Sequence, residues 1–173
     1  MRKTISFLLA TVLFVASSFA QTTSVDKLYK HSGQVLDVKV VRVGEFNVSY
    51  KYPGEESEQV IGKLAISKIV YGSGRTEEVS EKVVIGGKED WEKVQVITDN
   101  AQVVGLKKGE EVRGKTSGLL SYNTAGSADK KASRKLREAA AEMGAPFILL
   151  TSDKNDGFGV KQAIKNGVTY SYK

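Results

Sequence analysis

The chain has 173 residues, a formal net charge of +6, no cysteine and a single histidine. The lack of cysteine excludes disulfides, thiolate nucleophiles, thiolate metal sites and lipid-modified cysteine, and one histidine cannot form a typical zinc site. For these reasons we expect no metal and no cofactor. The net charge is well short of the basic stripe of a nucleic-acid-binding protein, so we expect no nucleic-acid partner either.

Residues 1–20 have the pattern of a secretory signal peptide. Two basic residues precede the apolar run 5–16, and small residues lie just before Gln21. The run is shorter than the ~20 residues that span a bilayer, so a cleaved signal is preferred to an uncleaved anchor. We expect cleavage after Ala20, export to the periplasm or the medium, and no integral membrane span afterwards.

Cleavage would remove two of the 26 basic residues, leaving 24 against 20 acidic residues and a net charge of +4. Residues 21–85 have nine residues of each sign. The excess therefore lies wholly in residues 86–173, which have 15 basic and 11 acidic residues.

Residues 21–85 are predicted to form a small β-barrel-like module of short strands. In the strand 34–43 the apolar face changes after Val40, which predicts a bulge or a sharp bend. The next strand places Phe46, Val48, Tyr50 and Tyr52 on one face at period two. Two glycines and three charged residues then predict a linker over 86–90.

This first half contains the layout D-x-L-Y-x-x-x-G, then V-x-x-V-G, then Y-K, then I-S-K-I-V-Y-x-x-G-R. The layout resembles a short all-β module of small secreted proteins from Bacteroidetes-type bacteria. Its strand spacing is also similar to that of SH3-like and Sm-like small barrels. The resemblance implies the fold and secretion, and it implies no activity.

Residues 91–173 are predicted to form an α+β module with one main helix on a mostly antiparallel sheet. Strands are expected at 91–97 and 102–108, with weaker candidates at 110–116 and 119–122. The later strand 147–151 is expected to be fully buried. Residues 152–159 are expected to turn the chain, and Asn166-Gly167 predicts the turn of a final hairpin.

The helix is predicted over about 128–143, with Ser127 as its N-cap and Asp129 favourably placed in the first turn. Gly144 suits the position just after its end, and Pro146 prevents continuation. The spacing predicts a stripe facing the sheet: Ala128, Ala132, Leu136, Ala139 and Met143.

The string LREAAAEMGAPFILLTS, at 136–152, resembles the helix–Gly-Ala–strand core of YbjQ-like proteins. The outer-membrane sensor lipoprotein of the Rcs envelope-stress pathway shares this layout. The resemblance implies an envelope-located module that binds or senses and does not catalyse. The Rcs sensor depends on disulfides and a lipidated cysteine, so its mechanism is not carried over to this cysteine-free chain.

The string GEEVRGKT, at 109–116, fits the phosphate-loop pattern G-x-x-x-x-G-K-[ST] at every fixed position. Such a loop follows a buried strand and opens a helix, and neither flank here suits that context. Glu110 and Glu111 would also repel phosphates. We expect a glycine-rich strand–turn–strand that binds no nucleotide, with Lys115 uninvolved in phosphate binding.

Two other candidate sites have simpler interpretations. The string SDKNDG, at 152–157, resembles a calcium loop, but Lys154 occupies a ligand position and Ala163 stands where a glutamate is needed. A polar hairpin turn is favoured there. His31 is expected to be a solvated turn residue, so no catalytic residue is predicted.

Two sets of side chains are candidates for ligand binding. Five cations crowd the helix, and they form either a solvated face, which we favour, or a face for an anionic partner: Lys130, Lys131, Arg134, Lys135 and Arg137. Two tyrosine pairs, Tyr50/Tyr52 and Tyr170/Tyr172, either stack on sugars or pack in the core, and core packing is favoured.

The predicted function is that of a non-enzymatic exported protein that binds or senses another envelope component. The alternative is a module that binds an anionic polymer, lipopolysaccharide or a glycan through the basic helix or exposed tyrosines. A hydrolase, using acidic pairs or His31, ranks third. The sequence leaves the identity of the partner and the oligomeric state open.

Overall fold

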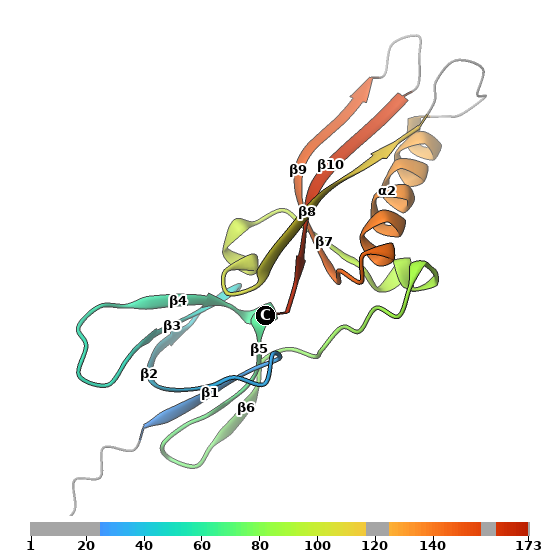
Figure 1. The fold of residues 1–173 in the computed structure, drawn as a ribbon. Helices are drawn as coiled ribbons and strands as arrows, with labels where there is room; N and C mark the ends of the chain where they lie inside the picture. The colour runs from blue at the N-terminus through green and yellow to red at the C-terminus, as the bar shows by residue number, and fades with distance from the viewer. Residues whose placement is uncertain (1–24, 117–124, 157–161, 173) are drawn as a thin grey trace, which may run out of the picture.

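The computed structural model describes residues 25–116, 125–156 and 162–172. Figure 1 shows two sheets at opposite ends of an elongated molecule, with one helix beside the second sheet. The predicted signal peptide, 1–20, lies outside the described residues, and so does the strand candidate 119–122. No helix in the described ranges has the length and apolar character needed to cross a membrane.

The first sheet is antiparallel, in the order β4-β3-β2-β1-β5-β6. The 3-10 turn η1 (Lys63–Ala65) joins β4 to β5 along the chain. No closed barrel is found among the described strands, because β4 and β6 are the two edges of this sheet. The strands are β1 (Asp26–Lys30), β2 (Val35–Val43), β3 (Asn47–Lys51), β4 (Gln59–Gly62), β5 (Ile66–Val70) and β6 (Thr76–Glu78).

The predicted bend in the second strand is confirmed. The pairing of β2 with β3 shifts register between Val40 and Arg42. The Asp26 carboxylate accepts hydrogen bonds from the backbone N–H groups of Val40, at 2.9 Å, and Gly72, at 2.8 Å. One side chain therefore holds the bend of β2 and the turn after β5 together.

The second sheet has the order β7-β9-β10-β8, and β7 runs parallel to β9 while the other pairs are antiparallel. Helix α2 (Ala125–Glu142) packs against β8, β9 and β10, which confirms the α+β class. The remaining elements are η2 (Lys88–Lys93), β7 (Gln95–Ile97), η3 (Asn100–Val103), β8 (Lys107–Lys115), β9 (Phe147–Asp156) and β10 (Gln162–Ser171).

Helix α2 begins earlier than predicted, and near its C-terminal end it buries different residues from those predicted. Ser127 lies inside α2, so its assignment as the N-cap is wrong. Ala128, Ala132 and Leu136 are fully buried as predicted, whereas Met143 is half exposed. Below Leu136 the buried positions are Ala140 and Ala141, because η2 packs against α2 there.

Gly144 ends α2 as predicted. Its φ of 65° is the left-handed conformation that glycine adopts without strain. Its N–H donates to the Ala141 carbonyl at 2.9 Å, and the Ala145 N–H donates to the Ala140 carbonyl at 2.9 Å. The chain turns here before Met143 can face the sheet, which explains the exposure of that side chain.

The predicted hairpin at Asn166-Gly167 is wrong, because both residues lie inside the continuous strand β10. The pairing with β9 shifts register at this point. A Cβ on Gly167 would collide with the Ile148 side chain and come within 2.9 Å of the Leu149 carbonyl oxygen. Glycine is required here by close packing of strands and not by a turn.

Three further segments differ from the prediction. The expected strand 91–97 is limited to β7, because residues 91–93 belong to η2. Residues 152–156 belong to β9, so the expected turn does not begin there. The expected strand 102–108 begins instead as the 3-10 turn η3, which the Asp99 side chain caps by accepting from the Ala101 N–H at 2.8 Å. The weaker candidate 110–116 is confirmed as most of β8.

The two sheets share part of one hydrophobic core. Phe147 and Leu149 of β9 join the cluster around Leu28 and Ile69 of the first sheet. Ile148 points the other way and packs under α2. The first part of β9, residues 147–149, is thus buried on both faces as predicted, but Thr151 is exposed, so the strand 147–151 is not fully buried. Whether residues 86–90 separate two independent modules stays a prediction.

Candidate anion-binding cavity beside Trp91

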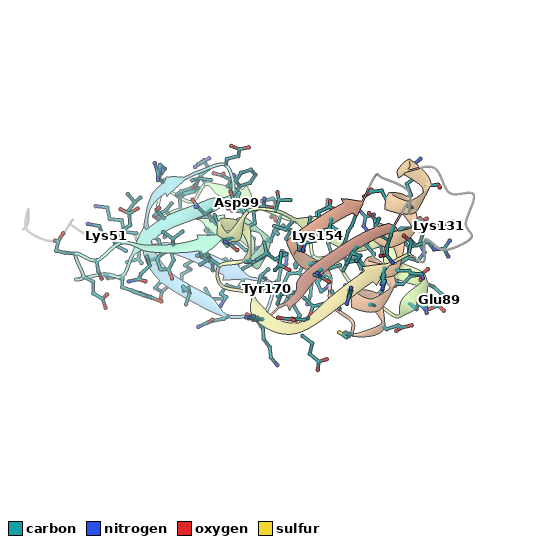
Figure 2. All side chains as sticks on the ribbon, turned by 90° about the horizontal axis from the view of Figure 1, so that it is seen from above. Lys51, Glu89, Asp99, Lys131, Lys154 and Tyr170 are labelled. Atoms are coloured by element: carbon teal, nitrogen blue, oxygen red, sulfur yellow. The ribbon has the colours of Figure 1, made fainter. Side chains whose placement is uncertain are left out.

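A cavity of about 400 Å³ lies between η2 and the first half of α2. Figure 2 places Lys131 of α2 and Glu89 of η2 at one end of the molecule and Lys51 at the other. The spacing of the helical residues, three and four apart, puts most of them on one face. The cavity is lined by Trp91 and by Asp129, Lys130, Lys131, Ser133, Arg134 and Arg137.

Arg134 is held in place by two contacts. Its guanidinium carbon lies 5.1 Å from the centroid of the Trp91 ring, within the range of a cation–π interaction. Its Nε donates to a Glu138 carboxylate oxygen at 2.7 Å. Since a guanidinium has four other N–H donors, Arg134 remains able to bind an anion in the cavity.

Arg137, one turn further along, has no such support. Its Nε is buried and has no hydrogen-bond partner. Leaving a buried charged donor unpaired is unfavourable, and such a group in a native structure calls for a partner. Among the described residues Arg137 and Lys130 form no ion pair, so two cations of the cavity lack a carboxylate.

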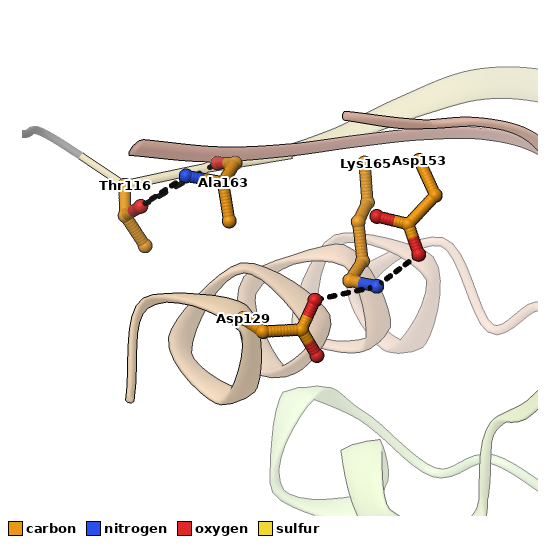
Figure 3. Close-up of polar contacts among 5 residues, drawn as sticks. All are labelled: Thr116, Asp129, Asp153, Ala163 and Lys165. Carbon is orange, nitrogen blue, oxygen red and sulfur yellow. Dashed lines mark hydrogen bonds and ion pairs between the residues drawn. The ribbon is translucent and has the colours of Figure 1, made fainter. Parts of the chain in front are cut away.

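The Asp129 carboxylate is already paired. It lies 2.9 Å from the Nζ of Lys165 on β10, and Lys165 also lies 2.6 Å from the Asp153 carboxylate (Figure 3). Burial alone would lower the pKa of Lys165, but the hydrogen bonds and charges of the two aspartates raise it. Lys165 therefore stays protonated at neutral pH and partly offsets the negative charge at Asp129.

The five predicted cations do not act as one set. Lys130, Lys131, Arg134 and Arg137 line the cavity. Lys135 turns away and donates to the Lys115 carbonyl of β8 at 3.1 Å. Four of the five are exposed, as the favoured solvated face requires, and only Arg137 is half-buried. Whether the face receives an anionic partner stays a prediction.

Trp91 was not a candidate in the sequence, and neither was Lys165. Trp91 belongs to η2, which is separated from α2 along the chain by β7, η3 and β8, so no local spacing links the two. Packing between η2 and α2 brings them together, with a further ion pair of 2.7 Å between Lys88 and Glu142. The only sequence signal is that Trp91 is the single tryptophan.

The phosphate-loop string has no phosphate-loop geometry. Its residues run along β8 in antiparallel pairing with β10. Thr116 Oγ1 accepts from the backbone N–H of Ala163 at 3.0 Å (Figure 3). A Cβ on Gly114 would collide with the Ala132 carbonyl oxygen of α2. The second glycine of the motif is thus a packing residue under the helix.

His31 lies in the predicted turn, but its expected solvation is wrong. The half-buried ring packs 5.0 Å from the centroid of Tyr172. The Ser80 hydroxyl donates to the Ile66 carbonyl at 2.8 Å, so it accepts from His31 Nε2 at 2.9 Å. Burial and the charge of Lys82 lower the pKa of His31, despite the hydrogen bond with Ser80.

The tyrosine pairs pack in the core, as favoured from the sequence. Tyr50 is buried and meets Tyr52 edge to face at 5.5 Å. Burial, together with hydrogen bonding to Tyr52, raises the pKa of Tyr50 to about 12. Tyr170 and Tyr172 pack against the same shared core. Tyr52 and Tyr170 are only half-buried and also line open pockets, so stacking of a sugar on these two stays a prediction.

Within the described ranges, no group of three or more histidine, cysteine or acidic side chains is placed to hold a metal ion. The calcium-loop residue Asp153 instead pairs with Lys165. Gly157 lies outside the described residues.

Comparison with known proteins gives no match: no protein-family model, no curated protein and no solved structure is similar to this chain. The functional inference therefore rests on the sequence and on the geometry of the Trp91 cavity.

Proposed function

We propose that this chain is an exported, non-enzymatic binding protein of the cell envelope, and that the Trp91 cavity binds an anionic group of its ligand. One observation carries the proposal. The buried Nε of Arg137 has no partner in a cavity whose other cationic wall, Arg134, is already fixed in position. An anion bound between them would satisfy the unpaired donor.

The paired carboxylates support binding in preference to catalysis. Asp129 is engaged by Lys165 and Glu138 by Arg134. A general acid or base needs a carboxyl group with access to the substrate's proton and a suitable pKa. Asp129 of the cavity and Glu138, the partner of Arg134, instead hold cations in place, which suits a recognition site.

The location rests on the sequence. The pattern of residues 1–20 is that of a cleaved signal peptide, and the second half resembles YbjQ-like envelope modules. We also propose that the bend in β2 gives the first sheet the curvature of SH3-like and Sm-like small barrels. In this proposal the first sheet is a scaffold and the cavity on the second half is the site.

Trp91 provides a direct test, because it is the only tryptophan and it lines the cavity. Its emission is measured while the purified protein is titrated, at constant ionic strength, with glucuronate and with glucose 1-phosphate. We expect a saturable change with at least one of these acids and none with glucose. No saturable change with either acid would refute the anion site.

Two variants locate the effect. Arg137→Gln is expected to abolish the change. Arg75→Gln is the matched control, because Arg75 also stacks on an aromatic ring, that of Tyr71, and pairs with a glutamate, Glu77, but in the first sheet. If both variants lose the response equally, binding does not occur at the Trp91 cavity.

A further inference from the structure

We infer that the anionic group recognised by the cavity is a phosphate monoester. This inference rests on the proposed function and names the chemical class of its ligand. It starts from the cations that remain unpaired around the cavity, since these must be balanced by whatever binds.

The charge of the cavity matches a dianion better than a monoanion. Glu138 balances Arg134, Lys165 is shared between Asp129 and Asp153 and offsets part of the charge of Asp129, and Lys131 adds a further cation to the lining. Lys130 and Arg137 therefore remain, among the described residues, as two cations with no acidic partner. A phosphate monoester has a charge of about −1.5 to −2 at pH 7, whereas a carboxylate has a charge of about −1.

The donors of the cavity also exceed what a carboxylate needs. Arg137 and Arg134 are one turn apart, and helical side chains lean toward the N-terminus. Arg137 thus leans toward the turn that contains Ser133, whose hydroxyl adds another donor to the lining. Two guanidinium groups, an ammonium and a hydroxyl suit the three terminal oxygens of a phosphate monoester.

The remaining wall fits the group to which the phosphate is esterified. Trp91 presents a half-buried indole beside the cations. The cavity of about 400 Å³ lies in the usual size range of small-ligand pockets. A phosphorylated sugar or a glycerol phosphate headgroup would place its phosphate on Arg137 and its carbon skeleton toward the stems of the lining side chains.

The test compares dissociation constants from Trp91 fluorescence for four probes: glucose 1-phosphate, glycerol 3-phosphate, glucuronate and inorganic phosphate. We expect the two phosphate monoesters to bind at least tenfold more tightly than glucuronate. If glucose 1-phosphate binds more tightly than glycerol 3-phosphate, the source is a phosphorylated glycan; the reverse order indicates a lipid headgroup. Binding of glucuronate as tight as that of both esters would overturn the inference while leaving the anion site intact.

A second variant is needed because a substitution of the half-buried Arg137 could impair folding. Lys130→Gln changes an exposed side chain, and its fold can be checked by circular dichroism. We expect it to weaken binding of glucose 1-phosphate about tenfold, the effect of one charge-assisted contact, and glucuronate binding less than twofold. Equal weakening of both ligands would contradict the assignment of a dianion. Absence of binding by all four probes would refute the proposed function as well.

Discussion

Gly114 of β8 lies directly under α2, with no room for a side chain. An added Cβ would meet the Ala132 carbonyl oxygen and lie 2.9 Å from the Leu136 backbone nitrogen. Because these are backbone atoms, they cannot rotate away. We expect Gly114→Ala to lower the free energy of unfolding by ~1–3 kcal/mol, the usual effect of overpacking. Urea denaturation measures this change.

Gly126 provides the matched control. It lies in α2 with no atom within 4 Å of an added Cβ. Gly126→Ala should therefore raise the free energy of unfolding by ~0.5–1 kcal/mol, because alanine is the better helix former. A Gly114→Ala protein at least as stable as the wild type would show that Ala132 and Leu136 leave room for a Cβ on β8, and would contradict the close approach.

His31 should make the stability of the fold depend on pH. Its pKa in the folded protein lies below its usual value near 6.5, so the unfolded chain binds the proton more tightly. Its contribution is fully present above about pH 6.5 and is lost as the pH falls through the lower folded-state pKa. The denaturation midpoint should decrease on acidification from pH 8 to pH 5.

Other groups also titrate in this range, so the comparison is with His31→Gln. Glutamine retains a donor for the Ser80 hydroxyl but cannot be protonated. We expect the difference in midpoint between the two proteins to shrink as the pH falls. A difference that is constant from pH 8 to pH 5 would show that His31 is not buried as described.

At the scale of elements, α2 buries a stripe that differs in part from the sequence pattern. Leu136 is fully buried beneath it, whereas Met143 is 50% exposed. Leu136→Ala should lower the free energy of unfolding by ~2–5 kcal/mol. Met143→Ala should change it by less than about 0.5 kcal/mol, as surface substitutions do. Denaturant titration of both variants distinguishes this register from the predicted one, in which both residues face the sheet.

Sequence patterns identified the elements that depend on local chemistry. Period-two alternation predicted the strands of the first sheet, and Gly144 with Pro146 predicted the end of α2. The Asn166-Gly167 prediction failed because this dipeptide, although typical of turns, lies inside β10, where Gly167 allows close packing of strands. Gly167 has no side chain because Ile148 and Leu149 occupy the space, a contact between strands that local sequence does not reveal.

The candidate site was predictable only in part, for the same reason. Helical spacing grouped the cations of α2, but it did not separate Lys135, which contacts β8, from Arg137, which lines the cavity. Trp91 and Lys165 reach the site through η2 and β10. Their positions depend on tertiary packing, which the pattern along one helix cannot encode.

At the scale of the whole molecule, the shared core should couple the two sheets. Phe147 is buried in the cluster of the first sheet and meets Tyr172 edge to face at 5.5 Å. The Tyr172 hydroxyl accepts from the Val83 N–H at 2.9 Å, which ties the end of β10 to the segment after the first sheet. These contacts favour unfolding of the chain as one cooperative unit.

This cooperativity can be measured with two probes. Trp91 fluorescence reports on the second sheet and α2, whereas far-ultraviolet circular dichroism reports on both sheets. We expect one coincident transition in urea, and we expect Phe147→Ala to destabilise the protein by ~3–5 kcal/mol by both probes. Two separated transitions would instead indicate that residues 86–90 link independent modules.

The central claim is that Arg137 Nε, unpaired in the free protein, gains an acceptor when an anionic ligand binds. The most direct measurement is the arginine Nε–Hε region of a ¹H–¹⁵N NMR spectrum, with Arg137 assigned by its loss in Arg137→Lys. On saturation with glucose 1-phosphate, we expect the Arg137 resonance to shift and its exchange with water to slow, while Arg75 is unchanged. An Arg137 resonance that stays in place at saturation, or that moves no more than that of Arg75, would contradict the account.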